Sequence, residues 1–271
     1  IAEALNKAAV YGNNIDLDAF DDNDDVHAQS VAAMSDPDKK TMEKVGMELQ
    51  DAEDRSGTFL QVDNAPIEIK TKKDTPMVLM NTGAAAQKYP ELVDKYWWKA
   101  VKADTDKYTA KTALEKENGY FVHLQKGVKI AAPVQSCMFM SHENQLQRVH
   151  NIIILEEGAE LNLITGCASD PSLDKGVHVG VSELYIGKNA KLTFTMIHSW
   201  GHNVAVRPRT VAIVDEGGLY MSNYVNMDKV ADVQMYPTVH LIGKGATTRL
   251  NSILVAPEGA HMDIGGNAIL E

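Results

Sequence analysis

Short apolar runs that alternate with polar residues fill the chain from Gly119 onward, and Gly or Asn residues separate the runs. Two segments show this pattern most clearly, NIIILEEGAELNLITGC and SELYIGKNAKLTFTMIH. Each contains an apolar run, a tight corner and a second, alternating run, which predicts a strand, a corner and a strand. Gly158 and Asn189 stand at the two corners, where a positive φ is often needed and where Gly, or less readily Asn, carries little steric cost.

The same corner recurs at a near-constant interval along this part of the chain. The corner residues are Gly127, Gly158, Asn189, Gly217 and Gly245, which lie 31, 31, 28 and 28 residues apart. A further corner at Gly259 follows after 14 residues, so each interval is expected to contain two half-turns. Strand-rich repeats of this size are typical of a stacked solenoid. We therefore predict a right-handed parallel β-helix for residues 117–271, in preference to a β-sandwich, whose turns come about every 8 to 12 residues without fixed self-similarity.

Residues 1–116 have a different pattern, which predicts a smaller, mixed and mostly helical N-terminal domain. Helical periodicity covers three windows, 36–55, 88–101 and 104–117. Asp36 is the expected N-cap of the first helix, because Pro37 suits the first helical position. The segments TFLQVD and IEIKT alternate like short strands. Two bulky residues, Trp97 and Trp98, are expected to pack on the β-region rather than to stack on a ligand.

Composition narrows the range of functions. The formal net charge of -11 argues against a nucleic-acid partner, because sequence-independent affinity for phosphates comes from Lys and Arg. No apolar run approaches the roughly 20 residues that cross a bilayer, and the N-terminus lacks a secretory pattern, so we expect a soluble cytoplasmic protein without a membrane partner. The acidic run from Asp21 to Asp25 lacks the Gly and distal Glu of a calcium loop and is expected to be solvated.

The two cysteines, Cys137 and Cys167, give no disulfide framework, although a single disulfide between them stays open. Cys167 follows the Gly158 corner by nine residues, and His198 follows the Asn189 corner by nine. If one interval is one coil, the two side chains lie on neighbouring rungs, roughly 5 Å apart. A thiolate and an imidazole so placed suit transient sulfur transfer or partial ligation of iron. The alternative is a buried, inert cysteine beside a hydrogen-bonded histidine.

The other candidate residues are expected to be structural. Cys137 follows its corner by ten residues, one more than Cys167, which places it on the opposite face of the strand, so the two cysteines should not cooperate. Trp200 should share the face of His198 and pack in the core or at an interface. Three further histidines of this region, His150, His178 and His202, match no zinc spacing.

Several segments of the β-region together carry a family resemblance. They are FVHLQKGVKIAAPVQ, RVHNIIILEEGAELNLITGCAS, VHVGVSEL with His178 and Glu183, FTMIHSWGHNV with Trp200, and TVHLIGKGATTRLNSI. With them the chain resembles the SufB/SufD proteins, scaffolds of the SUF iron-sulfur cluster assembly system. The resemblance implies that Cys167 handles sulfur or a transient iron-sulfur cluster. It also implies a second SufB/SufD-type subunit, in a homodimer or heterodimer, and a SufC-type ABC ATPase partner.

The resemblance further places an ATPase-docking segment and a second cysteine or histidine beyond Glu271. Because the chain begins at Ile1 without Met and stops directly after a repeat-like segment, we expect one or both ends to be incomplete. The sequence has no GxxxxGK[ST], GxSxG or helix-opening GxGxxG motif, so ATP hydrolysis should belong to a partner and the chain itself should not be an enzyme.

Two alternatives to a cluster-assembly scaffold stay open. The first is a β-helix carbohydrate-active enzyme, which would need carboxylates clustered on one sheet face. Several acidic residues of the β-region instead fall at corners, namely Glu156, Glu157, Asp215 and Glu216. The second alternative is a purely structural SufD-like subunit without cluster chemistry.

Overall fold

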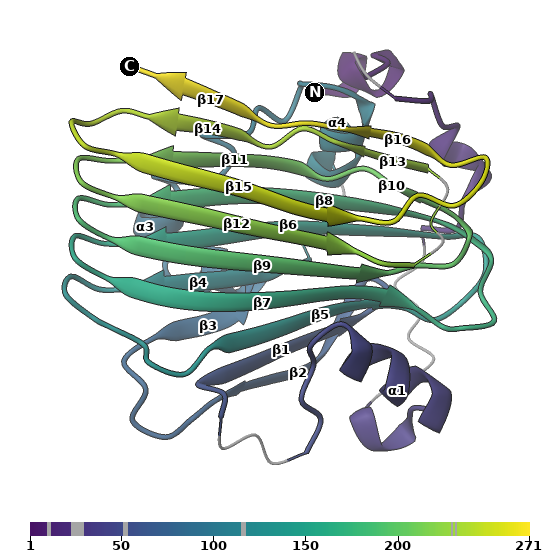
Figure 1. Ribbon diagram of the computed structural model, residues 1–271, viewed down its shortest axis with the longest axis horizontal. Helices are drawn as coiled ribbons and strands as arrows, with labels where there is room; N and C mark the ends of the chain where they lie inside the picture. The colour runs from purple at the N-terminus through teal and green to yellow at the C-terminus, as the bar shows by residue number, and fades with distance from the viewer. Residues whose placement is uncertain (10–11, 23–29, 51–53, 115–117, 229, 231) are drawn as a thin grey trace.

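The chain forms a β-solenoid with a small mixed N-terminal region packed against it, as the computed structural model in Figure 1 shows. The structure describes residues 1–9, 12–22, 30–50, 54–114, 118–228, 230 and 232–271. Most strands stack in parallel, one coil above the next, in two sheets with the core between them. The prediction of a β-solenoid in the C-terminal part of the chain is therefore confirmed.

The first sheet contains, in spatial order, β15 (Thr247–Leu254), β12 (Leu219–Asn226), β9 (Lys191–Ser199), β7 (Glu160–Ser169), β5 (Val134–Met140), β1 (Gly57–Val62) and β2 (Ala65–Thr71). The second contains β16 (His261–Ile264), β13 (Asp232–Met235), β10 (Asn203–Val206), β8 (Lys175–Ile186), β11 (Arg209–Val214), β14 (Thr238–Leu241), β17 (Asn267–Leu270), β6 (Gln145–Leu155), β4 (Tyr120–Leu124) and β3 (Val78–Asn81). The pairs β1–β2 and β3–β4 are antiparallel.

The corners behave as the sequence predicts. Every predicted corner residue has a positive φ, namely Gly127, Gly158, Asn189, Gly217, Gly245 and Gly259. The corners also stack on each other, because the Gly158 N–H donates to the Lys188 carbonyl at 2.8 Å and the Asn189 N–H donates to the Glu216 carbonyl at 2.8 Å. Each coil therefore closes at the same place, and residues at equal distances from successive corners become neighbours.

The N-terminal helices are shorter than predicted. They are α1 (Asp36–Lys44), α2 (Thr82–Lys88), α3 (Pro90–Val93) and α4 (Lys107–Leu114), with 3-10 helices η1 (Ala2–Asn6), η2 (Leu17–Ala19) and η3 (Val31–Ala33). The predicted N-cap of α1 is wrong by one residue, because the Ser35 hydroxyl, and not Asp36, accepts from the Asp38 N–H. Helix α1 stops before Gly46, whose φ of 88° is not helical. The window 88–101 contains the last residue of α2, then the short α3 and turns, with Trp98 at a φ of 53°.

Strands β1 and β3 lie before residue 117 but extend the two sheets, since β1 pairs with β5 and β3 pairs with β4. The division of the chain at 116 and 117 stays a prediction.

Trp97 and Trp98 pack on the solenoid as expected, with ring centroids 5.4 and 4.1 Å from that of His150 on β6. Of the acidic run, residues 23–25 lie outside the described residues, and Asp22 forms ion pairs with Arg148 and Lys111.

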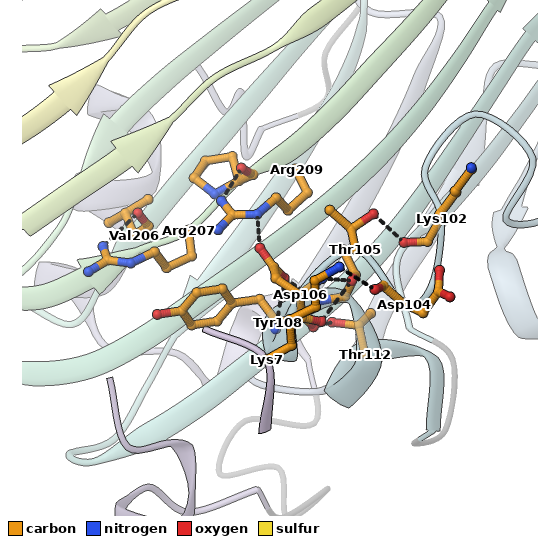
Figure 2. Close-up of polar contacts among 12 residues, drawn as sticks. Lys7, Lys102, Asp104, Thr105, Asp106, Tyr108, Thr112, Val206, Arg207 and Arg209 are labelled. Carbon is orange, nitrogen blue, oxygen red and sulfur yellow. Dashed lines mark hydrogen bonds and ion pairs between the residues drawn. The ribbon is translucent and has the colours of Figure 1, made fainter. Parts of the chain in front are cut away.

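Charged groups also tie the N-terminal region to the second sheet (Figure 2). Arg209 donates to the Asp106 carboxylate at 2.7 Å, and its guanidinium lies 5.0 Å from the centroid of the Tyr108 ring on α4. The fully buried Arg207 donates to both carboxylate oxygens of Asp232 at 2.8 Å. The Arg209 contacts therefore hold α4 on the solenoid, whereas the Arg207–Asp232 pair, which satisfies a buried guanidinium, joins two parts of the solenoid itself.

The interior of the solenoid has two chemically different ends. Near the corners it is aliphatic, with Leu124, Leu155, Ile186 and Val214 buried in the core. At the opposite ends of the strands the buried residues include Thr165, Cys167, His178, His198 and Asn226. On the outside, α1 packs so closely on β7 that a Cβ at Gly166 would lie 2.4 Å from Val45. Within the part of the chain that the structure describes, no helix is long and apolar enough to cross a membrane.

Candidate functional site

Cys167 on β7 and His198 on β9 are register partners in adjacent parallel strands, as their equal distance from the corners predicts. Parallel strands place such partners about 5 Å apart. Both side chains are buried, with 3% and 2% of their surface exposed. The structure therefore brings the two candidate residues together inside the solenoid, whereas their role toward sulfur or iron stays a prediction.

The column of inward-facing residues continues on both sides of this pair. Met138 is the register partner of Cys167 on β5, and Asn226 is the partner of His198 on β12. Asn226 is fully buried, and neither polar atom of its side chain has a hydrogen-bond partner among the described residues. The sequence interpretation missed Asn226, although it lies nine residues after Gly217, the same offset that selected Cys167 and His198.

Two buried histidines flank a single indole in this part of the interior. The His198 Nδ1 lies 3.0 Å from the Tyr224 hydroxyl, and the His178 Nδ1 lies 2.8 Å from Gln147 Oε1. The Trp200 ring centroid lies 4.8 Å from that of His178 and 5.8 Å from that of His198. Burial lowers the pKa of His178 to about 3 and lowers the pKa of His198 well below its usual value, so both imidazoles are neutral.

Cys167 lines a small internal cavity of about 20 Å³. Its other lining residues include Asn151, Thr165, His178, Gly180, Ser182 and Met196. A cavity of this size holds a single water-sized group, since roughly 10–15 Å³ is the minimum for one water. An iron-sulfur cluster contains several iron and sulfur atoms and is much larger than one water, so it does not fit beside Cys167 in this state of the solenoid.

The buried environment also sets the reactivity of both thiols. Burial, with a smaller contribution from Cys137, raises the pKa of Cys167 well above its usual value. Cys137 pairs in register with Gly166 and lies in the separate cluster under α1, where burial raises its pKa to about 12. The prediction that the cysteines face opposite sides is confirmed, and both are free. Because only the thiolate is a good nucleophile, both side chains are inert in this state.

The other histidines do not join this site. His150 Nε2 lies 2.8 Å from the fully buried Glu183 carboxylate, which also accepts hydrogen bonds from backbone N–H groups of the turn after α3. Sequence reasoning missed this carboxylate as an organising group, because its donors lie more than 80 residues earlier in the chain. Among the described residues, no three His, Cys, Asp or Glu side chains gather closely enough to hold a metal ion.

Comparisons with known proteins agree with this architecture. A family model described as the SufBD protein N-terminal region matches residues 59–136, and one described as the SUF system FeS cluster assembly, SufBD core domain, matches residues 138–271.

Three relatives illustrate the similarity. An iron-sulfur cluster assembly SufBD family protein of Methanothermobacter thermautotrophicus (strain Winter) is 41% identical over 276 residues, which cover 99% of this chain and 67% of the relative. One from Archaeoglobus fulgidus is 43% identical over 86% of this chain and 62% of its own length. One from Staphylococcus aureus (strain MRSA252) is 27% identical over 85% of this chain and 50% of its own length. The chain thus spans about two thirds of the length of the first two relatives.

Proposed function

Because this chain belongs to the SufBD family of SUF iron-sulfur cluster assembly proteins, we propose that it is a scaffold subunit that accepts sulfur at Cys167. The observation that carries the proposal is the one-atom cavity beside this thiol. A single sulfur atom bonded to Cys167 would occupy that space, and the neutral imidazole of His178 lines the same cavity. Cys137 has no comparable surroundings, because it is packed among apolar side chains under α1.

Iron is the second cargo in this proposal. Cys167 supplies a soft sulfur ligand and His198 supplies a borderline nitrogen ligand on the next strand. Since the closed cavity admits one atom only, iron ligation by this pair belongs to a state in which the coils have moved apart. A SufC-type ABC ATPase would drive that movement, and a second SufB/SufD-type subunit would complete the assembly.

The corner carboxylates favour this proposal over a carbohydrate-active enzyme. Glu157 forms an ion pair with Lys126 at 2.7 Å, and Glu216 forms one with Lys188 at 3.0 Å. All four side chains are well exposed at the solenoid edge, where such pairs contribute little and keep the corners solvated. They are therefore engaged at the surface and not arranged around a sugar-binding face.

Replacing Cys167 with alanine is expected to abolish sulfur acceptance. The wild-type protein is treated anaerobically with inorganic polysulfide under native conditions in which it opens transiently. Peptide mass spectra should then show a gain of one sulfur atom at Cys167. Cys137→Ala is the matched control and should retain that gain. Reconstitution with iron and sulfide provides the second readout. Equal iron binding and equal visible absorption in wild type and Cys167→Ala would refute the proposal and favour a purely structural, SufD-like subunit.

An ABC-type ATPase is expected to co-purify with the full-length protein from a native lysate. The expectation follows from the lack of a phosphate-binding loop in this sequence, because assembly that consumes ATP then needs a partner that hydrolyses it. Affinity capture followed by mass spectrometry measures this, with an unrelated β-solenoid protein as control. Recovery of the scaffold without any such ATPase would contradict the partnership.

A further inference from the structure

An open hollow of about 480 Å³ lies on the surface where β7 and β9 end. Residues that line it include Lys44, Ser169, Ser172, Leu173, Trp200 and His202. Ser169 follows Cys167 by two residues on β7 and therefore lies on the same face of that strand. Two residues of a parallel strand span about 7 Å, so the hollow begins a short distance from the Cys167 thiol.

The Trp200 indole forms the wall of this hollow on the side of the two buried histidines. It lines the hollow, yet only 4% of its surface is exposed. Its inner face lies 4.8 Å from the His178 ring at an interplanar angle of 35°, and its ring meets the His198 ring edge to face. Because His178 lines the inner cavity with Cys167 and stacks on Trp200, which lines the hollow, these two rings lie between the cavity and the surface hollow.

Packing alone holds the Trp200 indole in place, whereas His178 also has a hydrogen bond with Gln147. The buried Trp200 Nε1 has no hydrogen-bond partner among the described residues. Rotation of the indole therefore breaks no hydrogen bond and sacrifices only its contacts with the two imidazoles and with the core. The second apolar side chain at this boundary is Leu173, which belongs both to the core and to the wall of the hollow.

We propose that this hollow is the entrance through which sulfur reaches Cys167 and that the stacked Trp200 and His178 rings form its gate, with the Trp200 indole as the outer layer. The inference rests on the proposed acceptance of sulfur at Cys167. The substrate class is a persulfide or polysulfide that presents one terminal sulfane sulfur. The body of such a donor stays in the hollow, and the inner cavity receives the single transferred atom.

The transfer is a thiol exchange without net oxidation. Cys167 Sγ, once deprotonated, attacks the terminal sulfur of a donor R–S–SH. A new S–S bond forms at Cys167, the S–S bond of the donor breaks, and the donor leaves as the thiol R–SH with the proton that Cys167 gave up. With the gate closed, burial keeps the thiol protonated and unreactive; with the gate open, water reaches it and removes the desolvation that opposes ionisation.

The gate predicts which variant exposes Cys167. Methyl methanethiosulfonate, a small thiol reagent, is added to the native protein, and modification of each cysteine is followed by peptide mass spectrometry. In Trp200→Ala the reagent should modify Cys167 about tenfold or more faster than in wild type, because stacking of the indole against two rings opposes opening. The rate in Trp200→Phe should lie between these two. Leu173→Ala should also accelerate the reaction. Trp97→Ala, which removes an indole from the outer face, should leave the rate at Cys167 unchanged.

Cys137 serves as the internal reference, because general loosening of the fold would expose both cysteines. Selective acceleration at Cys167 supports the gate. An unchanged rate at Cys167 in Trp200→Ala and Leu173→Ala, or equal acceleration at Cys137, overturns it. The reagent donates no sulfane sulfur, so this test is independent of the persulfide experiment. Failure of the gate would leave sulfur acceptance standing, and failure of sulfur acceptance would appear in the Cys167→Ala comparison.

Discussion

Replacing Glu183 with alanine should lower the free energy of unfolding by about 3–5 kcal/mol, the usual cost of removing one partner from a buried charged network. Glu183 is fully buried and accepts hydrogen bonds from the backbone N–H groups of Trp98, Ala100 and Val101 at 2.7, 2.7 and 3.0 Å. It also lies 2.8 Å from His150 Nε2. Alanine would leave these buried donors without an acceptor and without water to replace it, and each buried unpaired donor costs about 1–3 kcal/mol. Urea unfolding of wild type and variant measures the difference.

Glu156 provides a matched control for this prediction. Its carboxylate lies 2.8 Å from His123 Nε2 and accepts the Lys126 backbone N–H at 3.0 Å, which are the same kinds of contact in smaller number. Its side chain is 41% exposed, however, so water can replace the lost partner. Glu156→Ala should therefore cost no more than about 1 kcal/mol. Equal losses in the two variants would show that burial is not the source of the Glu183 effect.

Acidification from pH 7 to pH 5 is the second large effect, and His178 should account for about 2 kcal/mol of lost stability. The folded protein lowers the pKa of His178 from 6.5 to about 3 by burying the imidazole. His178 therefore takes up a proton near pH 6.5 in the unfolded chain but stays neutral at that pH in the folded chain. The contribution of neutral His178 to the stability is fully present above pH 6.5 and is lost progressively as the pH drops toward 3. His198, whose pKa burial also lowers, adds a loss of the same sign.

Variants separate this contribution from that of the carboxylates, which titrate in the same range. Urea unfolding at pH 7 and pH 5 should show a smaller loss in His178→Gln and in His198→Gln than in wild type, because glutamine does not titrate. His261→Gln, at an exposed position on β16, should keep the wild-type loss. An unchanged loss in both buried variants would mean that the two imidazoles are hydrated in the folded protein, contrary to their burial.

Local sequence patterns predicted the strands of the solenoid but overestimated the lengths of the N-terminal helices. Residues 36–55 show helical periodicity, yet α1 ends at Lys44, because Gly46 leaves the helical region and Val45 packs against Gly166 of β7. The window 88–101 also reads as one helix. Its second half instead turns back so that three backbone N–H groups reach Glu183. In both places a contact with the distant solenoid outweighs the local helical preference.

The sequence by itself determined the solenoid and the pairing of Cys167 with His198. Each coil closes through a residue at positive φ, so a fixed offset from Gly158 and Asn189 translates directly into register between strands. Only the tertiary structure decided that the cavity beside Cys167 holds one atom, that the Trp200 and His178 rings lie between it and the surface hollow, and that Glu183 holds the turn after α3. These features depend on side-chain packing and on contacts across more than 80 residues, and neither leaves a periodic trace in the chain.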